Sequence, residues 1–154
     1  MANTYTQIHI HLIFAVQGRA ALLPLPHAPE LYRYITGIVS GQGQKLLAIN
    51  GMPDHVHLLI GLRPDKALSD LVRDIKASSS KFLNERGWLR EKFAWQAGFG
   101  AFSYATSQLP DVIQYIQRQQ EHHAKRTFLE EYTLLLKRFE VEYDPRYLFT
   151  DANK

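Results

Sequence analysis

Hydrophobic and polar positions follow two different periods along this chain. Apolar and polar residues alternate from Tyr5 to Val16, which is typical of a strand with one buried face. The alternation places His9 and His11 on the face opposite to the aliphatic side chains. Pro53-Asp54 predicts a tight turn, so the segments on either side of it form a hairpin. Three further strands are predicted: Lys45–Met52, His55–Leu62 and Ala94–Tyr104.

Other segments carry apolar residues at helical spacing. Pro110 begins one of them, with Asp111 in the first turn where a negative charge suits the helix dipole. Thr127 with Glu130 three residues later predicts a capping box. The predicted helices are Glu30–Ser40, Lys66–Glu85, Pro110 to about His123, and Thr127–Glu140. Two segments are expected to be irregular: Gly18–Pro29 and the tail Tyr143–Lys154.

The order of these elements is strand, helix, strand, strand, helix, strand, followed by helices. This order predicts an α+β fold of the ferredoxin-like (RRM-like) class, with an antiparallel sheet and helices on one face. The remaining helices form a C-terminal extension. We expect one domain over residues 1–154, with its core at about 5–149, and the second face of the sheet free to carry a site.

Composition narrows the chemistry. The chain has 154 residues, 45% of them hydrophobic, and no cysteine, so disulfides and thiolate metal sites are excluded. The net charge of +3 is compatible with a nucleic-acid partner without establishing one. The N-terminus lacks the basic and apolar regions of a signal peptide, and no apolar run is long enough to span a membrane. We therefore expect a cytoplasmic protein with no membrane partner.

The most informative stretch is Met52–Ile60, where His55 and His57 flank Val56. Alternate residues of a strand point the same way, so both imidazoles are expected on one face. Such a pair can bind a divalent cation from one side and leave its other positions open. His9 and His11 form a second pair on a neighbouring strand, and all four can equally be hydrogen-bonded histidines of a sheet face.

A second informative segment contains Tyr115 and Gln119, four residues apart on a predicted helix, with His122 on the same face. A phenol, with a pKa of about 10, can attack a phosphodiester when a metal draws charge from the phosphate. His55, His57 and the Gln119 oxygen could hold that metal, with magnesium or manganese favoured once phosphate is a co-ligand. Alternatively, Tyr115 is an ordinary half-buried aromatic residue and Gln119 a solvated polar one.

Three ordered segments resemble the signature blocks of one family, the single-tyrosine HUH transposases of small insertion sequences (the IS200/IS605-like family). The segments are Met52–Leu59, Trp95–Ser103 and Tyr115–His123. HUH denotes two histidines around a bulky apolar residue, here Val56. The resemblance extends from about Tyr5 to Phe149 and implies a single HUH transposase domain.

The resemblance also implies roles for residues. His55, His57 and Gln119 match metal ligands for magnesium or manganese, and Tyr115 matches the nucleophile. The family cleaves single-stranded DNA beside hairpins, leaves a 5′-phosphotyrosine and a free 3′-hydroxyl, and then rejoins strands. It needs no nucleotide cofactor. It acts as a homodimer in which the tyrosine helix of one subunit can complete the histidine site of the other, which makes residues 105–110 a tether.

Basic and aromatic side chains offer candidate contacts with DNA. Lysines and arginines near the site can bind phosphates, and Phe99, Phe102 and Tyr104 can stack on unpaired bases. Equally, these cations can form an ordinary solvated surface and these aromatics a core. The candidate cations are Arg73, Lys76, Lys81, Arg118, Lys125 and Arg126.

Three other functions are compatible with the same residues. A domesticated relative would process repeated palindromes of its host with the same chemistry. A non-catalytic module would bind single-stranded nucleic acid on a ferredoxin-like sheet by stacking alone. A metal-dependent phosphodiesterase would use water, so it would turn over without a protein–DNA adduct.

Overall fold

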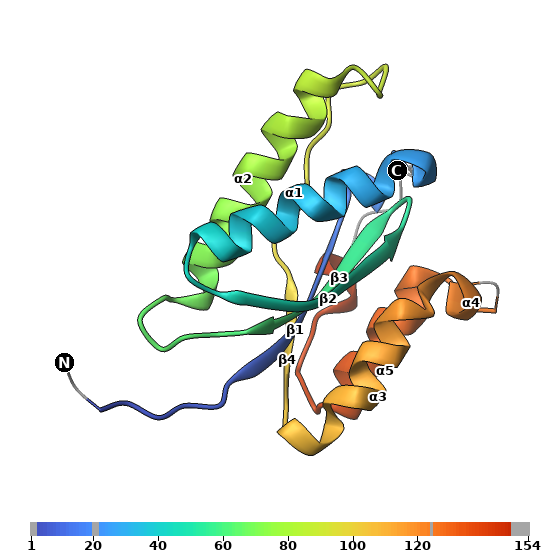
Figure 1. Cartoon of the computed structure of the whole chain (residues 1–154). Helices are drawn as coiled ribbons and strands as arrows, with labels where there is room; N and C mark the ends of the chain where they lie inside the picture. The colour runs from blue at the N-terminus through green and yellow to red at the C-terminus, as the bar shows by residue number, and fades with distance from the viewer. Residues whose placement is uncertain (1–2, 20–21, 124, 149–154) are drawn as a thin grey trace.

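Four strands form one antiparallel sheet in the computed structural model, which describes residues 3–19, 22–123 and 125–148. The strand order is β2-β3-β1-β4, so β1 and β3 lie in the middle. This order, with a helix after β1 and another after β3, is the predicted ferredoxin-like arrangement (Figure 1). The strands are β1 His9–Ala15, β2 Lys45–Met52, β3 His55–Gly61 and β4 Gly100–Tyr104.

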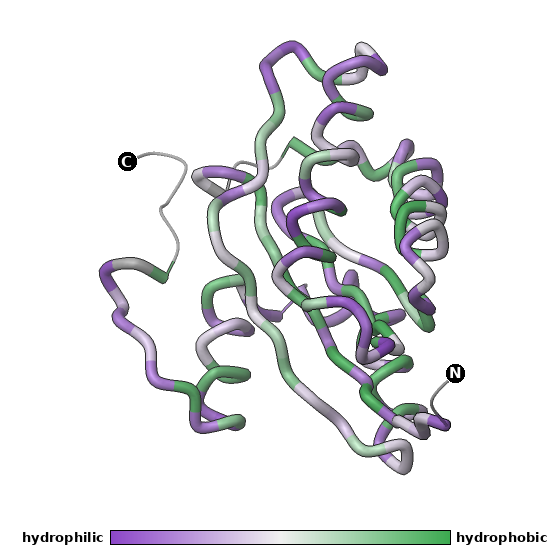
Figure 2. Tube along the Cα trace, turned by 90° about the vertical axis from the view of Figure 1, so that its left-hand side faces the viewer, coloured by the Kyte–Doolittle hydropathy of each residue, from purple (hydrophilic) through white to green (hydrophobic). Residues whose placement is uncertain are grey.

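Two helices, α1 (Ala28–Gly41) and α2 (Leu68–Arg86), cover one face of the sheet (Figure 1). Hydrophobic and hydrophilic residues succeed one another along the helical coils (Figure 2), and the buried residues of α1 and α2 form an apolar stripe on each helix that packs in the core. These stripes meet the alternate side chains of β1 and β3 in the main hydrophobic core. Its members include Leu12, Phe14, Val56, Leu58, Ile60, Ile35 and Ile75.

The second face of the sheet is covered by α3 (Leu109–Gln117), α4 (Gln119–His123) and α5 (Phe128–Arg138). This face can carry a site, as expected, but it is not open, because the C-terminal helices cover it. Apolar side chains of the strands on this face require burial, and the stripes of α3 and α5 provide it. Ile13 and Phe102 pack against α5, and Leu59 packs against α3. A site on this face is enclosed between sheet and helices.

Several element boundaries differ from the predicted ones. Strand β1 begins at His9, because its neighbours β3 and β4 both end opposite that residue. Strand β4 begins only at Gly100, since Gly98 has a positive φ of 87° and Trp95 makes an isolated bridge to Val16. The helix predicted to run from Pro110 to His123 is interrupted at Arg118, which separates α3 from α4.

The predicted irregular segments contain short 3-10 turns. The capping box at Thr127 is present, with its hydroxyl accepting from the Glu130 amide at 3.2 Å. The ends of the predicted domain (1–2 and 149–154), Phe149 of its core and the last residues of the tail lie outside the described residues. None of the helices described is long and apolar enough to cross a bilayer. The 3-10 turns in or at the edge of the predicted irregular segments are Gln17–Arg19, Leu25–His27 and Pro145–Tyr147, and a fourth, Thr106–Gln108, lies between β4 and α3.

Gly51 permits the close approach of β2 to β3 beside the histidines. A Cβ at this position would lie 2.3 Å from the carbonyl oxygen of His55 and 3.0 Å from Cα of Val56. These backbone atoms belong to a strand packed on both faces, so Gly51→Ala should destabilise the fold by about 1–3 kcal/mol in urea titrations. The control Gly37→Ala, in α1 with no atom within 4 Å, should stabilise it by up to about 1 kcal/mol. Equal stability of Gly51→Ala and wild type would contradict this account.

Candidate active site

The two histidines of β3 lie side by side on the face that α3–α5 cover. Val56 between them points into the opposite core, as strand alternation requires. The imidazoles of His55 and His57 are fully buried, and their ring centroids are 5.0 Å apart. The pair is thus presented to the C-terminal helices.

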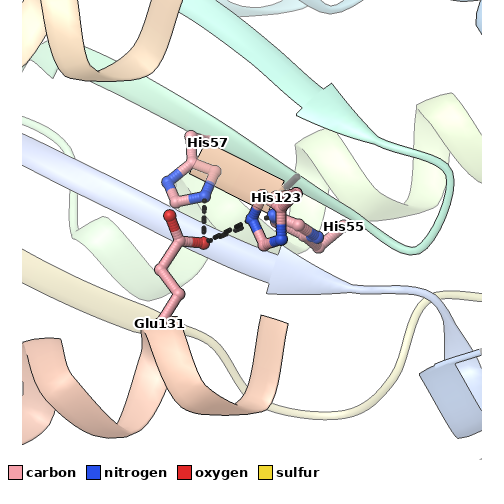
Figure 3. Close-up of side chains that lie close together, drawn as sticks. All are labelled: His55, His57, His123 and Glu131. Carbon is pink, nitrogen blue, oxygen red and sulfur yellow. Dashed lines mark hydrogen bonds and ion pairs between the residues drawn. The ribbon is translucent and has the colours of Figure 1, made fainter. Parts of the chain in front are cut away.

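The carboxylate of Glu131, from α5, lies at the centre of the site (Figure 3). Its Oε1 is 3.1 Å from Nε2 of His57 and 3.0 Å from Nε2 of His123. The same oxygen is 3.5 Å from Nε2 of His55. Glu131 is almost completely buried, so this carboxylate depends on these partners rather than on water.

Tyr115 and Gln119 reach the other oxygen of the same carboxylate. The Tyr115 hydroxyl donates to Glu131 Oε2, and Gln119 Nε2 donates to it at 3.0 Å. Gln119 Oε1 also lies 3.2 Å from Nε2 of His55. The break at Arg118 leaves both side chains on the same side. One chain therefore brings together all four predicted chemical residues, His55, His57, Tyr115 and Gln119.

A histidine of the neighbouring strand β1, His11, contacts the ring of His57. His11 Nε2 lies 2.8 Å from Nδ1 of His57, and their rings are stacked at 5.0 Å. His11 is fully buried, and its Nδ1 has no hydrogen-bond partner among the described residues. His9, half-buried at the start of β1, instead pairs with the Gln7 side chain. Of the second histidine pair, only His11 belongs to the site, where it orients His57.

Burial and hydrogen bonding set the protonation of the site. Burial lowers the pKa of His57 to about 4. Burial would lower the pKa of His55 too, but hydrogen bonds to Asp54 and Glu131 raise it instead. Burial opposes ionisation of Glu131, yet hydrogen bonds with His123, His55 and His57 hold its pKa well below its usual range. Glu131 is thus a carboxylate.

Burial also raises the pKa of the Tyr115 phenol, and the adjacent charge of Glu131 raises it further. The phenol therefore keeps its proton as the site stands. A phenolate requires additional positive charge close to Glu131.

The donor atoms of this cluster fit a divalent cation. One ligand atom from each of His55, His57, His123 and Glu131 lies within 4.8 Å of all the others. His55 Nδ1 lies 2.7 Å from the Asp54 carboxylate, which orients the ring as a histidine ligand is usually oriented by its second partner. This orientation turns Nε2 of His55 toward the oxygens of Glu131 and Gln119, where a bound cation would be within reach of all three atoms.

Two residues of this cluster, His123 and Glu131, are not predicted by the sequence patterns. His123 belongs to the third resembling block without a role of its own, and Glu131 lies outside the three blocks. A signal was available for Glu131. It lies between Phe128 and Leu135 on the apolar stripe of α5, where a carboxylate needs a buried partner.

The candidate DNA-contacting cations divide into two groups. Arg73, Lys76 and Lys81 belong to α2, on the face away from the site. Arg73 is paired with Asp70 and Asp74, and Lys76 donates to backbone carbonyls of Gln96 and Gly98. The other group, at the C-terminal helices, comprises Arg118, Lys125 and Arg126.

A cavity of about 430 Å³ adjoins the nucleophile candidate between α3 and α5. Tyr115 and Glu131 line it together with Tyr104, Arg126 and Arg138. Of the three aromatics proposed to stack, Tyr104 alone lines this cavity. Phe102 is buried against α5, and Phe99 packs against the opposite core.

Residues 4–119 match the family model described as "Transposase IS200 like". The chain belongs to this family. This match confirms the resemblance predicted from the three sequence blocks. As a member of the family, the protein is a transposase. The matched region contains His55, His57, Tyr115 and Gln119 but ends before His123 and Glu131.

Individual proteins similar to this chain are also described as transposases. The transposase is 28% identical to the ISDra2 transposase TnpA of Deinococcus radiodurans over 120 residues, which are 75% of this chain and 86% of that protein. It is also similar to the crystal structure of a putative transposase from Deinococcus radiodurans R1, at 25% identity and a TM-score of 0.62 over 77% of this chain and 95% of that one. A REP-associated tyrosine transposase bound to a REP hairpin shares the fold, at 17% identity and a TM-score of 0.60 over 80% and 73% of the two chains.

Proposed function

We propose that this transposase cleaves and rejoins single-stranded DNA through a covalent bond to Tyr115. The observation that carries the proposal is the hydroxyl of Tyr115 beside the buried imidazoles of His55 and His57, joined to them through Glu131 in one chain. His55, His57 and Gln119 are its proposed ligands for magnesium or manganese. A bound divalent cation would polarise the phosphate and offset the charge that develops on the phenol oxygen.

The protein's own residues account for the rest of the step. The Tyr115 oxygen attacks phosphorus, a new O–P bond forms, and the bond from phosphorus to the 3′-oxygen breaks. The phenolic proton leaves along its hydrogen bond to Glu131 Oε2 and passes on to solvent, because the low pKa of Glu131 prevents this carboxylate from keeping it. The leaving 3′-oxygen takes a proton from solvent and becomes a free 3′-hydroxyl. Attack by a 3′-hydroxyl on the phosphotyrosine reverses the step and rejoins strands.

The proposed substrate is single-stranded DNA that carries hairpins. The hairpin in the related REP-associated structure supports this extension to the present chain. The cavity beside Tyr115 has the size of a small-ligand pocket, about 300–1,000 Å³, so it can accept a nucleotide flanking the scissile phosphate. Arg126 and Arg138 line the cavity and are suited to bind its phosphates.

The homodimer is likewise proposed from the family. The tyrosine of one chain lies at its own histidines, which supports a site completed within one subunit of that dimer. The segment 105–110, which includes the 3-10 turn Thr106–Gln108, connects β4 to the tyrosine helix within the chain.

A gel assay separates this function from its alternatives. Purified protein is mixed with labelled single strands bearing hairpins, with and without Mn²⁺, and a covalent band is sought after denaturation. A metal-dependent band supports the proposal. Cleavage without a band indicates a water-dependent phosphodiesterase, and binding without cleavage indicates a non-catalytic module. A domesticated role is distinguished by the flanking DNA, which would then lack the paired hairpins of a mobile element.

Arg138 should contribute to DNA affinity. Arg138→Gln removes one cation from the wall of the cavity, so we expect weaker binding of a single strand and a salt dependence lower by about 0.7 in log–log slope. Fluorescence anisotropy over a series of salt concentrations measures both. The matched control is Arg33→Gln, on the exposed side of α1, which should leave affinity and slope unchanged. The same affinity for both variants would place the strand elsewhere.

A further inference from the structure

We infer that Glu131 and His123 complete the cation site, so that this transposase holds its metal with residues from beyond the family-matched region. The inference rests on the proposed function, because it concerns the same cation. It differs in its ligands: His123 and Glu131 take the place that the proposed function gives to Gln119, whose Nε2 instead donates to Glu131. The pair His55 and His57 gains a third imidazole from α4 and a carboxylate from α5.

The spacing of the donors is that of a ligand shell. Glu131 Oε1 is 3.0, 3.1 and 3.5 Å from Nε2 of His123, His57 and His55. Ligands about 2.1 Å from a common cation lie about 3.0 Å apart at an octahedral angle and about 3.4 Å apart at a tetrahedral one. The four donors converge from three elements, β3, α4 and α5.

The number of hydrogen-bond donors and acceptors around Glu131 Oε1 favours a bound cation over protons between these atoms. Three imidazole nitrogens face one carboxylate oxygen, and each must carry either a proton or a metal to make a favourable contact. Neutral imidazoles could each donate an Nε2 proton, but one carboxylate oxygen has about two lone-pair sites, so three donors exceed what Oε1 can accept. One divalent cation satisfies the same three lone pairs and the carboxylate charge together.

Glu131 is also held rigidly enough to act as a ligand. Phe128, one turn earlier on α5, stacks on the His55 ring with centroids 4.1 Å apart. Tyr132 and Leu135 anchor the same helix against Ile13 and Phe102 of the sheet. The second carboxylate oxygen accepts hydrogen bonds from Tyr115 and Gln119. One side chain thereby connects the cation site to the nucleophile.

The ligand set indicates the class of metal. Three imidazoles and one carboxylate suit a first-row transition metal better than Mg²⁺, which prefers oxygen ligands and keeps several waters. We therefore expect Mn²⁺ to bind more tightly than Mg²⁺. In six-coordinate geometry, four protein ligands leave two positions for phosphate oxygens or water.

Titration calorimetry with Mn²⁺ on the purified full chain, without DNA, tests the inference. Glu131→Gln keeps the shape of the side chain and removes its charge, and His123→Asn removes the third imidazole. Each should weaken Mn²⁺ binding by at least about 100-fold, because the loss of a ligand should exceed the roughly 10–100-fold cost of losing a ligand's orienting partner. The matched control is Glu121→Gln, an exposed carboxylate on α4, which should bind Mn²⁺ as wild type does. Circular dichroism confirms that each variant is folded.

The outcomes distinguish this inference from the proposed function. Wild-type affinity in folded Glu131→Gln or in His123→Asn overturns the inference, as does weakened binding in Gln119→Ala alone. If Glu131→Gln does not fold, His123→Asn decides. Weakened Mn²⁺ binding in both variants supports the inference even if no DNA adduct forms, in which case the proposed function fails and the metal site stands.

Discussion

Replacement of Tyr115 by phenylalanine is expected to abolish the covalent protein–DNA adduct while leaving affinity for a hairpin-bearing single strand unchanged. Only the hydroxyl that donates to Glu131 is lost. The ring keeps its contacts with His57 and His122, at centroid distances of 5.9 and 4.7 Å. Denaturing gels with end-labelled DNA and Mn²⁺ measure the adduct, and anisotropy measures binding.

The matched control is Tyr34→Phe, since Tyr34 lies on α1 at the opposite face and stacks on Phe82. This variant should form the adduct at the wild-type rate. If Tyr115→Phe still forms an adduct, Tyr115 is not the nucleophile, and Tyr104 and Tyr132 become the candidates.

Removal of His57 is the second change with a large expected effect. His57→Ala should lower both Mn²⁺ affinity and adduct formation by at least about 100-fold, because loss of a ligand should exceed the loss of its orienting partner. The side chain is fully buried between His11 and Glu131, so its loss removes a donor from the centre of the cluster. Calorimetry and the adduct gel measure the two losses on the same preparation.

His9→Ala serves as the control for His57→Ala. His9 lies in β1 but is half-exposed and pairs with Gln7 rather than with the cluster. The control should retain metal binding and adduct formation. Wild-type adduct formation in folded His57→Ala would show that the imidazole pair does not serve the chemistry.

Local sequence patterns predicted the strands and most helices because each follows from residues close together in the chain. The bounds of β2, Lys45–Met52, coincide with the predicted ones, since turn residues fix the end of this strand. Strand β1 starts later than its alternating pattern, because pairing depends on partners that the pattern does not contain. The break at Arg118 was missed, since Gln119 and its neighbours are compatible with a continuous helix.

In the site too, pairs of residues close together in the sequence could be predicted, and contacts between distant segments could not. His55 with His57, and Tyr115 with Gln119, are local pairs whose shared faces could be predicted from strand and helix periods. The contact of Glu131 with both pairs joins residues far apart in the chain, through the packing of α5 on the sheet. No local period encodes that contact. The one local sign was a carboxylate on the apolar stripe of a helix.

The central claim is tested most directly by mass spectrometry of the trapped adduct. Wild-type protein is incubated with Mn²⁺ and a hairpin-bearing single strand, digested with protease and nuclease, and searched for a peptide that carries a nucleotide. The account predicts a 5′-phosphate ester on Tyr115 and a matching DNA fragment that ends in a 3′-hydroxyl. Cleaved DNA with a free 5′-phosphate and no modified peptide, or a modification on another tyrosine, would contradict it.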